Sequence, residues 1–216
     1  MKNKFIKYPR TVHLPWSLGT NDDKVLNDDL CFHNKRVIVT IKMDGENFSG
    51  YNNFTHARSI DSNNHPSRNY VKGLWYSKCY SLNDNIRVCC ENLYAKHQIH
   101  YHYLKSYLYV ISVWKNDLCL NWSETKKYAE ELELPTVEVF YDDIYDKEEI
   151  TKTYDKYKQN SIDKVEGYVI RLYSEFLYKN FQNSVAKFVE PEFRNAVNNR
   201  GNHWLKEKII SNKLWI

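Results

Sequence analysis

The stretch from Val37 to Asn47 reads VIVTIKMDGEN, a β-branched run that ends on a lysine, followed two residues later by an aspartate and a glycine. Side chains alternate along a strand, so Lys42 and Asp44 are predicted to project from the same face. A lysine in this position is either a solvated strand end or a nucleophile with an acid beside it. Charged residues elsewhere in the chain favour the second interpretation.

Three other predicted strands each carry a charged residue among apolar ones. Glu91 lies in IRVCCENLY, Glu166 in KVEGYVIRLY and Lys187 in SVAKFVE. A charge inside an apolar strand costs free energy unless it is paired or used in a site. Each of these signals is weak alone. The order K-x-D-G, glutamate, E-G-x-V-x-R and lysine is a much stronger indication of a site.

The elements that position these residues are predicted to be strands interrupted by helices. Alternating or β-branched runs predict strands over 36–43, 86–94, 107–114, 136–141, 164–173 and 184–190. Helical periodicity predicts helices over 121–134, with Asn121 or Ser123 as N-cap and Pro135 as stop, and over 147–160. Because the helices are inserted rather than alternating strictly with the strands, the predicted fold class is α+β with mostly antiparallel sheets.

Composition restricts the class of protein. The chain has 216 residues, which suits one domain, and its net charge of +4 permits a polyanionic partner without requiring one. The five cysteines are odd in number and form no C-x-x-C pair, which favours a reducing compartment over a disulfide framework. No signal sequence or membrane-spanning apolar run is visible, so the expected location is cytoplasmic.

The order of motifs resembles that of the covalent nucleotidyltransferase superfamily, which contains polynucleotide ligases and RNA capping enzymes. KMDG at Lys42 resembles its nucleotidyl-lysine motif, and Ala57-Arg58-Ser59, Glu91, EGYVIR and VAKFV resemble the motifs that follow. Asn47, five residues past the lysine, resembles the RNA ligase branch. The strings KYPRTVHLPWS, ENLYAKHQIHY and SVAKFVEPEF…HW are similar to a small RNA ligase family of bacteria and phages, over about Tyr8 to Trp204.

The resemblance implies a single nucleotidyltransferase domain over 1–216, an ATP-grasp-like ligase fold of mostly antiparallel sheets with flanking helices. Its parts are an N-terminal segment 1–36, a catalytic core 37–190 and a short helical tail 191–216. No OB-fold sequence follows, which favours an RNA ligase over a capping enzyme or DNA ligase. ATP, Mg²⁺ or Mn²⁺, and RNA ends with 5′-phosphate and 3′-hydroxyl groups are the implied ligands. An end-processing kinase or phosphatase is an implied partner, and RNA repair the implied role.

The same resemblance assigns residues to roles. Lys42 is the nucleophile, and Glu91, Glu166 and Lys187 complete the catalytic set. Glu91, Glu166 and Asp44 are predicted metal ligands, since hard oxygen atoms suit Mg²⁺ and Mn²⁺. The predicted ATP or AMP contacts are Ile41, Asp44, Gly45, Tyr109, Ile111, Gly167 and Lys187, and the predicted RNA or phosphate contacts are Asn47 and Arg58. Lys42 must be neutral to attack, so a nearby cation such as Lys187 or the metal is expected to lower its pKa.

Two positions depart from the family pattern. Ile111-Ser112 stand where the family has an aromatic residue followed by aspartate, and Val185 replaces the first lysine of a K-x-K motif. A non-catalytic nucleotide- or RNA-binding module with the ligase fold is therefore an alternative. DNA nick sealing is another, because contacts to the 2′-hydroxyl cannot be read from one sequence. A zinc site at His97, His100 and His102 is a weaker alternative to an ordinary polar surface.

Overall fold

The computed structural model describes residues 5–17, 23–61, 64–193 and 208–215. Its strands are β1 Val12–His13, β2 Arg36–Ile41, β3 Glu46–Gly50, β4 Thr55–Ala57, β5 Ile86–Asn92, β6 Leu108–Lys115, β7 Leu118–Cys119, β8 Val139–Ile144, β9 Gly167–Leu172, β10 Phe176–Leu177 and β11 Val185–Val189. Its helices are α1 Asn69–Tyr76, α2 Trp122–Glu131 and α3 Lys147–Asn160, with short 3₁₀ turns at Leu30–Phe32, Pro66–Arg68, Cys79–Ser81 and Tyr178–Asn183.

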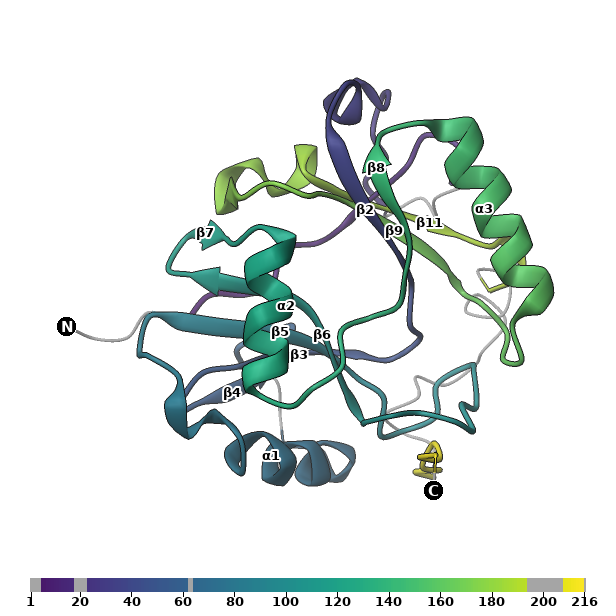
Figure 1. Ribbon diagram of the computed structural model, residues 1–216. Helices are drawn as coiled ribbons and strands as arrows, with labels where there is room; N and C mark the ends of the chain where they lie inside the picture. The colour runs from purple at the N-terminus through teal and green to yellow at the C-terminus, as the bar shows by residue number, and fades with distance from the viewer. Residues whose placement is uncertain (1–4, 18–22, 62–63, 194–207, 216) are drawn as a thin grey trace.

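The strands form two sheets that lie one above the other (Figure 1). The first sheet has the order β1-β11-β9-β2-β8 and is antiparallel except for the pair β1–β11. The second has the order β10-β7-β6-β5-β3-β4 and is antiparallel throughout. This confirms the predicted α+β class with mostly antiparallel sheets.

Helices cover the outer faces of the sheets. α3 packs along β8, and α1 and α2 lie against the second sheet (Figure 1). Both predicted helices begin where a side chain accepts a hydrogen bond from the first turn: Asn121 from the Glu124 N–H at 2.9 Å, and Asp146 from the Glu149 N–H at 3.0 Å. The predictions of these two helices are therefore confirmed, with Asn121 rather than Ser123 as the cap.

Three groups of buried side chains hold the layers together. One group joins the two sheets and α3, with Val39 of β2, Ile170 of β9, Trp114 of β6 and Tyr154 of α3 among its members. A second group fills the space between the second sheet and the helices α1 and α2, where Trp75 is fully buried. A third group includes Leu93 and Trp122. The predicted site residues therefore lie on or next to strands that are anchored in the core.

Parts of the fold differ from the sequence-based predictions. The strand predicted over 36–43 ends at Ile41, and β3, β4 and α1 were not predicted. Most of the predicted helical tail, 194–207 and residue 216, lies outside the described residues, as do His203 and Trp204. Residues 208–215 are not helical but lie against the chain at 95–104, through isolated bridges at Ser211 and Leu214.

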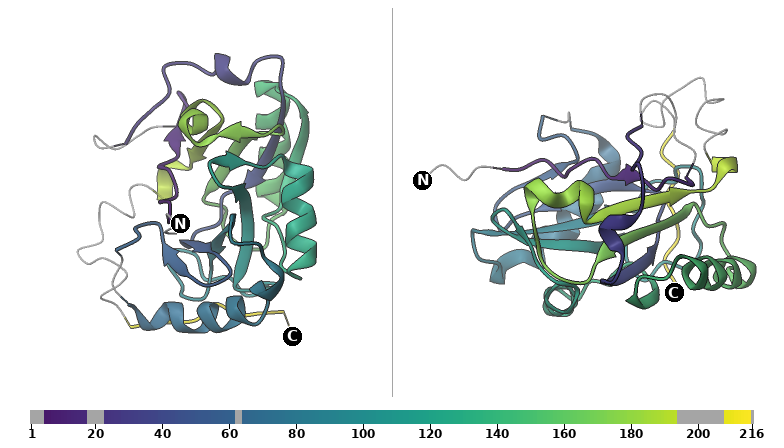
Figure 2. Two further views of the ribbon diagram at one scale, coloured as in Figure 1. Left: turned by 90° about the vertical axis from the view of Figure 1, so that its left-hand side faces the viewer. Right: turned by 90° about the horizontal axis from the view of Figure 1, so that it is seen from above.

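The N-terminal segment crosses the molecule to reach β1 (Figure 2). β1 pairs in parallel with β11, so that His13 stands opposite Lys187. This pairing brings the first residues of the chain next to a strand that lies almost at the other end of the sequence. Over the ranges that the structure describes, no helix combines the length and apolar character needed to cross a membrane.

Candidate active site

Lys42 directly follows β2 and is held beside β9. Its backbone N–H donates to the Gly167 carbonyl at 2.9 Å, and its Nζ donates to Glu166 Oε2 at 2.7 Å. The two side chains are largely buried, with 23% and 14% of their surfaces exposed. The K-x-D-G and E-G motifs, which are far apart in sequence, thus form one ion pair at the end of two antiparallel strands.

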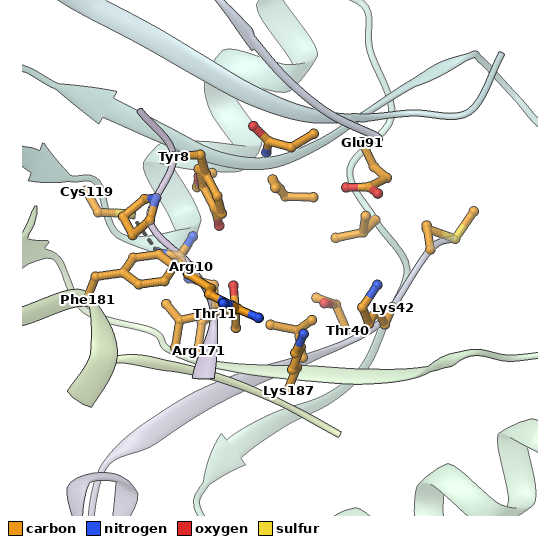
Figure 3. Close-up of a pocket in the computed structure, with 18 of the residues that line it drawn as sticks. Tyr8, Arg10, Thr11, Thr40, Lys42, Glu91, Cys119, Arg171, Phe181 and Lys187 are labelled. Atoms are coloured by element: carbon orange, nitrogen blue, oxygen red, sulfur yellow. Dashed lines mark hydrogen bonds between the residues drawn. The ribbon is translucent and has the colours of Figure 1, made fainter. Parts of the chain in front are cut away.

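Glu91 approaches the same lysine from the second sheet. It lies on β5 opposite Asn47 of β3, and its Oε1 accepts a hydrogen bond from the Gly45 N–H at 3.2 Å. Figure 3 shows Lys42 and Lys187 projecting from one side of the cavity while Glu91 projects from the other. Carboxylates from both sheets therefore face the predicted nucleophile.

These side chains line a cavity of about 310 Å³ between the sheets, which we call the Lys42 cavity. It is lined by Tyr8, Arg10, Asp23, Thr40, Ile41, Lys42, Asn47, Arg58, Glu91, Ile111, Ser112, Val169, Arg171 and Lys187, among others. Five of these are cations and two are acids, so the cavity suits a polyanion. The structure thus brings together Lys42, Glu91, Lys187, Ile41, Ile111, Asn47 and Arg58 from the predicted set, with Glu166 bound to Lys42.

The electrostatics of the two lysines differ from expectation. Burial lowers the pKa of Lys42, but the carboxylates of Glu166 and Glu91 outweigh burial and raise its pKa above the ordinary value. Burial and the positive charge of Lys42 instead lower the pKa of Lys187 to about 8. Lys187 therefore does not depress the pKa of Lys42 as expected, because Glu166 lies 2.7 Å from the Lys42 Nζ; the effect of a metal stays a prediction.

Burial also acts on the two glutamates. It raises the pKa of Glu91 to about 8, although Lys42 partly counteracts it. Burial likewise raises the pKa of Glu166, again against the effect of Lys42. Both carboxylates would gain from a further cation, since desolvated anions are stabilised by any positive charge brought beside them.

Asp44 has a structural role that was not predicted. Because β2 ends at Ile41, strand alternation does not continue to Asp44, which is 8% exposed. Its Oδ2 accepts hydrogen bonds from the backbone N–H groups of Gln98 and Ile99, both at 2.7 Å, and its own N–H donates to the Tyr101 hydroxyl at 2.9 Å. Asp44 thus fixes the turn after Lys42 to the neighbouring loop, and its role as metal ligand or ribose contact stays a prediction.

Tyr109 is likewise separated from Ile111. The register of β5 with β6 shifts so that Cys89 faces Ser112 and Cys90 faces Val110, which leaves Ile111 as an extra residue. A bulge of this kind interrupts the alternation of side chains. Ile111 lines the Lys42 cavity, whereas Tyr109 lines a separate cavity of about 640 Å³. The prediction that both share one adenine-binding face is corrected.

The two glycines predicted to make room for a ligand make room for the protein itself. A Cβ on Gly45 would lie 2.5 Å from the Asn92 carbonyl oxygen, and one on Gly167 would lie 2.1 Å from the Phe188 carbonyl oxygen. Gly167 also has a φ of +152°, which side-chain-bearing residues rarely adopt. Both glycines therefore permit close packing of the backbone at the site, and contact of either with nucleotide stays a prediction.

Asn47 and Arg58 lie at the edge of the Lys42 cavity next to β3 and β4. Arg58 is exposed and follows β4 directly. The Asn47 Oδ1 and Nδ2 atoms are buried and have no hydrogen-bond partner among the described residues. Leaving both atoms unsatisfied costs free energy, which an arriving ligand would recover.

Two residues of the site were missed from the sequence. Arg10 lines the cavity and pairs with Asp23 at 3.0 Å, and only the parallel pairing of β1 with β11 brings it there. Arg171 is 4% exposed, and its Nη1 has no partner among the described residues. The sequence did hold a signal for Arg171, which is a lone charge in an apolar strand just as Lys187 is.

Glu91 and Glu166 are the carboxylates that fit a divalent cation. The part of the chain that the structure describes holds no group of three or more His, Cys, Asp or Glu side chains arranged to bind a metal, which also removes the support for zinc at His97, His100 and His102. Mg²⁺ is commonly bound by one or two carboxylates together with substrate phosphates.

Comparison with models of protein families identifies the family to which the chain belongs. A model of the RNA ligase family matches residues 35–189, which contain Lys42, Glu91, Glu166 and Lys187. The chain belongs to the RNA ligase family. The match ends where β11 ends, so both sheets, except for β1, lie within it. No curated protein matches the chain.

Solved structures show that this RNA ligase family member shares its fold with larger enzymes. An archaeal ATP-dependent RNA ligase aligns with a TM-score of 0.59 at 16% identity, over 86% of this chain and 48% of that one. A mutant of the Naegleria gruberi RNA ligase with ATP and Mn gives 0.52 at 14%, over 78% and 53%. A putative ATP-dependent DNA ligase from Aquifex aeolicus gives 0.54 at 16%, over 91% and 56%. The chain spans about half the length of these proteins.

Proposed function

We propose that this RNA ligase family member is an ATP-dependent RNA ligase that joins 5′-phosphate and 3′-hydroxyl RNA ends through a lysyl-AMP intermediate. The observation that carries the proposal is the ion pair of Lys42 with Glu166, 2.7 Å long, in a cavity that Lys187 and Glu91 also line. The Naegleria gruberi enzyme, solved with ATP and Mn, shares this fold and supports the same ligands here.

In the first step Lys42 Nζ attacks the α-phosphorus of ATP. An N–P bond forms, the bond from the α-phosphorus to the bridging oxygen breaks, and pyrophosphate leaves. The lysine must first lose a proton, and Glu166 is the acceptor within hydrogen-bond reach. Glu91 and Glu166 would hold a divalent cation, which would supply positive charge for the transferring phosphoryl group. Lys187, which projects from the same side of the cavity as Lys42, stabilises the same charge.

The adenine of ATP fits between the two sheets. Ile111 of β6 and Val169 of β9 line the Lys42 cavity from opposite sides and offer apolar faces to a flat ring. Ile41 borders the same space, although its N–H is already bonded to the Glu138 carbonyl at 2.9 Å. Replacement of the family's aromatic residue by Ile111 therefore removes ring stacking but retains apolar contact.

In the second step an oxygen of the RNA 5′-phosphate attacks the phosphorus of lysyl-AMP. The N–P bond breaks, Lys42 regains a proton, and a 5′–5′ pyrophosphate linkage forms. In the third step the 3′-hydroxyl loses its proton to solvent and its oxygen attacks the 5′-phosphorus; a 3′–5′ phosphodiester bond forms, the bond from that phosphorus to the bridging oxygen breaks, and AMP leaves. Asn47 and Arg58 hold the 5′-phosphate in both steps, since guanidinium and amide groups are strong phosphate donors. Such a reaction serves RNA repair, where a kinase or phosphatase would supply the matching ends.

Ligation of matched substrates tests the proposal. RNA strands with 5′-phosphate and 3′-hydroxyl ends should be joined only with ATP and a divalent cation, with one AMP and one pyrophosphate released per bond. A protein that binds the RNA but joins nothing would be a non-catalytic ligase-like module. Preferential joining of DNA nicks of the same sequence would make it a DNA ligase.

A further inference from the structure

A second cavity adjoins the Lys42 cavity at Asn47, which lines both. This side cavity measures about 230 Å³ and lies between β3, the chain after β4 and helix α1. Its lining includes Asn47, His56, Ile60, Asn64, Arg68 and Lys72. No part of the proposed chemistry uses it.

The side cavity exists because β4 is short. β4 pairs with β3 only from Phe48 to Gly50, so the outer edge of β3 at Glu46 and Asn47 is not covered by β4. After Ala57 the chain turns away, and Arg58, the first residue of that turn, lines the Lys42 cavity. Asn47 and Arg58 therefore stand at the junction of the two cavities.

Polar atoms without partners are concentrated at this junction. Both side-chain polar atoms of Asn47 are buried and unpartnered within the described residues, as is Nε2 of His56, which also lines the side cavity. An amide presents a donor and an acceptor together, which matches the edge of a nucleobase. The junction is thus suited to a group that carries both kinds of polar atom.

The charges of the side cavity suit a nucleotide chain. Arg68 donates to both oxygens of Glu46, at 2.7 and 2.5 Å, so these two residues neutralise each other. Lys72, whose Nζ donates to Asn64 Oδ1 at 3.0 Å, is the third charged residue of the lining and leaves it positive. Lys72 is thus the unneutralised cation of the side cavity, and Arg58 supplies a cation to the adjoining Lys42 cavity.

We propose that the side cavity binds the terminal nucleoside of the RNA strand that carries the 5′-phosphate. The 5′-phosphate of that nucleoside lies at Asn47 and Arg58, within the Lys42 cavity, and its 3′-phosphodiester faces Lys72. The base is enclosed by His56, Ile60 and Asn64, which line the side cavity. This inference rests on the proposed ligase function and adds a subsite that reads the first nucleotide of one RNA end.

Sealing of pre-adenylated RNA tests the subsite when the RNA and the protein are each changed in turn. The RNA carries either a normal 5′-terminal nucleotide or an abasic ribose there, and the protein is wild type, Asn64→Ala or Lys72→Ala. Loss of the base should lower kcat/KM of the wild type about tenfold, the usual effect of losing one or two hydrogen bonds or a base contact. Asn64→Ala should show a similar loss with normal RNA and little further loss with abasic RNA. Lys72→Ala should raise KM for both RNAs.

Lys126→Ala is the matched control, because Lys126 is an exposed lysine of α2 that lines neither cavity. Lysyl-AMP formation should be unchanged in all three variants. Equal sealing of both RNAs by the wild type would overturn the subsite. So would an effect of Asn64→Ala that is as large with abasic RNA as with normal RNA, because the two changes would then act independently. If the wild type forms no lysyl-AMP, the ligase proposal fails separately. Binding of 5′-phosphorylated RNA with and without the terminal base, measured by fluorescence anisotropy, then decides the subsite without catalysis.

Discussion

Replacing Gly167 with alanine should destabilise the protein and disable Lys42 together. Gly167 begins β9, and its carbonyl accepts the hydrogen bond from the Lys42 N–H at 2.9 Å. A Cβ here would lie 2.1 Å from the carbonyl oxygen and 2.9 Å from the carbonyl carbon of Phe188. Both atoms belong to the backbone of β11, which cannot rotate away. The strands β9 and β11 must therefore separate next to Glu166.

The magnitude follows from two costs. A side-chain-bearing residue held in a rarely populated backbone region costs about 1–3 kcal/mol, and overpacking adds about 1–3 kcal/mol. We expect the free energy of unfolding to fall by about 3–5 kcal/mol, and the melting temperature of a chain of this size to fall by about 10 °C. A shift of the catalytic groups by an ångström should slow lysyl-AMP formation about 100-fold even in the folded protein.

Gly73→Ala is the control for this substitution. Gly73 lies in α1, and a Cβ there would meet no atom within 4 Å. Alanine in a helix interior should stabilise the protein by about 0.5–1 kcal/mol and leave adenylation unchanged. Thermal unfolding, followed by circular dichroism, measures the stability of the two variants. Labelling with α-phosphate-labelled ATP, at a temperature well below the melting temperatures of both variants, measures lysyl-AMP formation. A Gly167→Ala protein with wild-type stability and wild-type labelling would refute the strand packing described for the site.

Three further outcomes are expected. Asp44→Ala should lower the free energy of unfolding, measured in urea, by about 2–4 kcal/mol, because two buried backbone N–H groups lose the carboxylate oxygen that they share; unchanged stability would favour a ligand-binding role instead. Arg58→Ala should keep lysyl-AMP formation but seal pre-adenylated RNA poorly, and equal losses in both assays would contradict this division. Burial, with the Arg87 charge adding to it, lowers the pKa of His56 below 6.5. As pH falls, the unfolded chain therefore protonates His56 before the folded protein does, so the free energy of unfolding should fall as pH drops from 6.5 through the folded pKa. His56→Phe should reduce this dependence of stability on pH. An unaltered pH dependence in His56→Phe would contradict the role of His56.

The elements that the sequence predicted are those with strong local signals. α3 has a capping aspartate, two glutamates in its first turn and apolar residues on one side, and it begins and ends at the predicted residues. β9 and β11 are rich in β-branched and aromatic residues, with one charged residue each. α1 was missed because Gly73 lies in its middle and it is only eight residues long. β3 and β4 carry polar or small residues that gave no clear alternation.

Some residues of the candidate site could likewise be predicted from the sequence and others could not. Lys42, Glu91, Glu166 and Lys187 were predictable because charges in apolar strands need a partner or a function. The roles of Asp44 and Tyr109 were not, because they depend on where β2 stops and on the bulge at Ile111, and neither is marked by a distinctive residue. Residues that reach the site only through pairing of distant strands are the hardest to predict from the sequence.

Arg10 is one of these residues. It lies two residues before β1, and its position beside Lys187 follows from the parallel pairing of β1 with β11, more than 170 residues later in the chain. No periodicity within the first residues encodes this contact. Long-range pairing of this kind is fixed by the packing of the whole sheet, so local sequence patterns could indicate a basic segment but not its destination.

The most direct test of the account is to locate the covalent adduct. The protein is incubated with α-phosphate-labelled ATP and Mg²⁺ or Mn²⁺, digested, and the labelled peptide is sequenced by mass spectrometry. The account predicts one AMP on Lys42, acid-labile as a phosphoramidate should be, released by pyrophosphate and absent from Lys42→Ala. An adduct on Lys187, or a label that persists at full strength in Lys42→Ala, would contradict the assignment of Lys42 as the nucleophile.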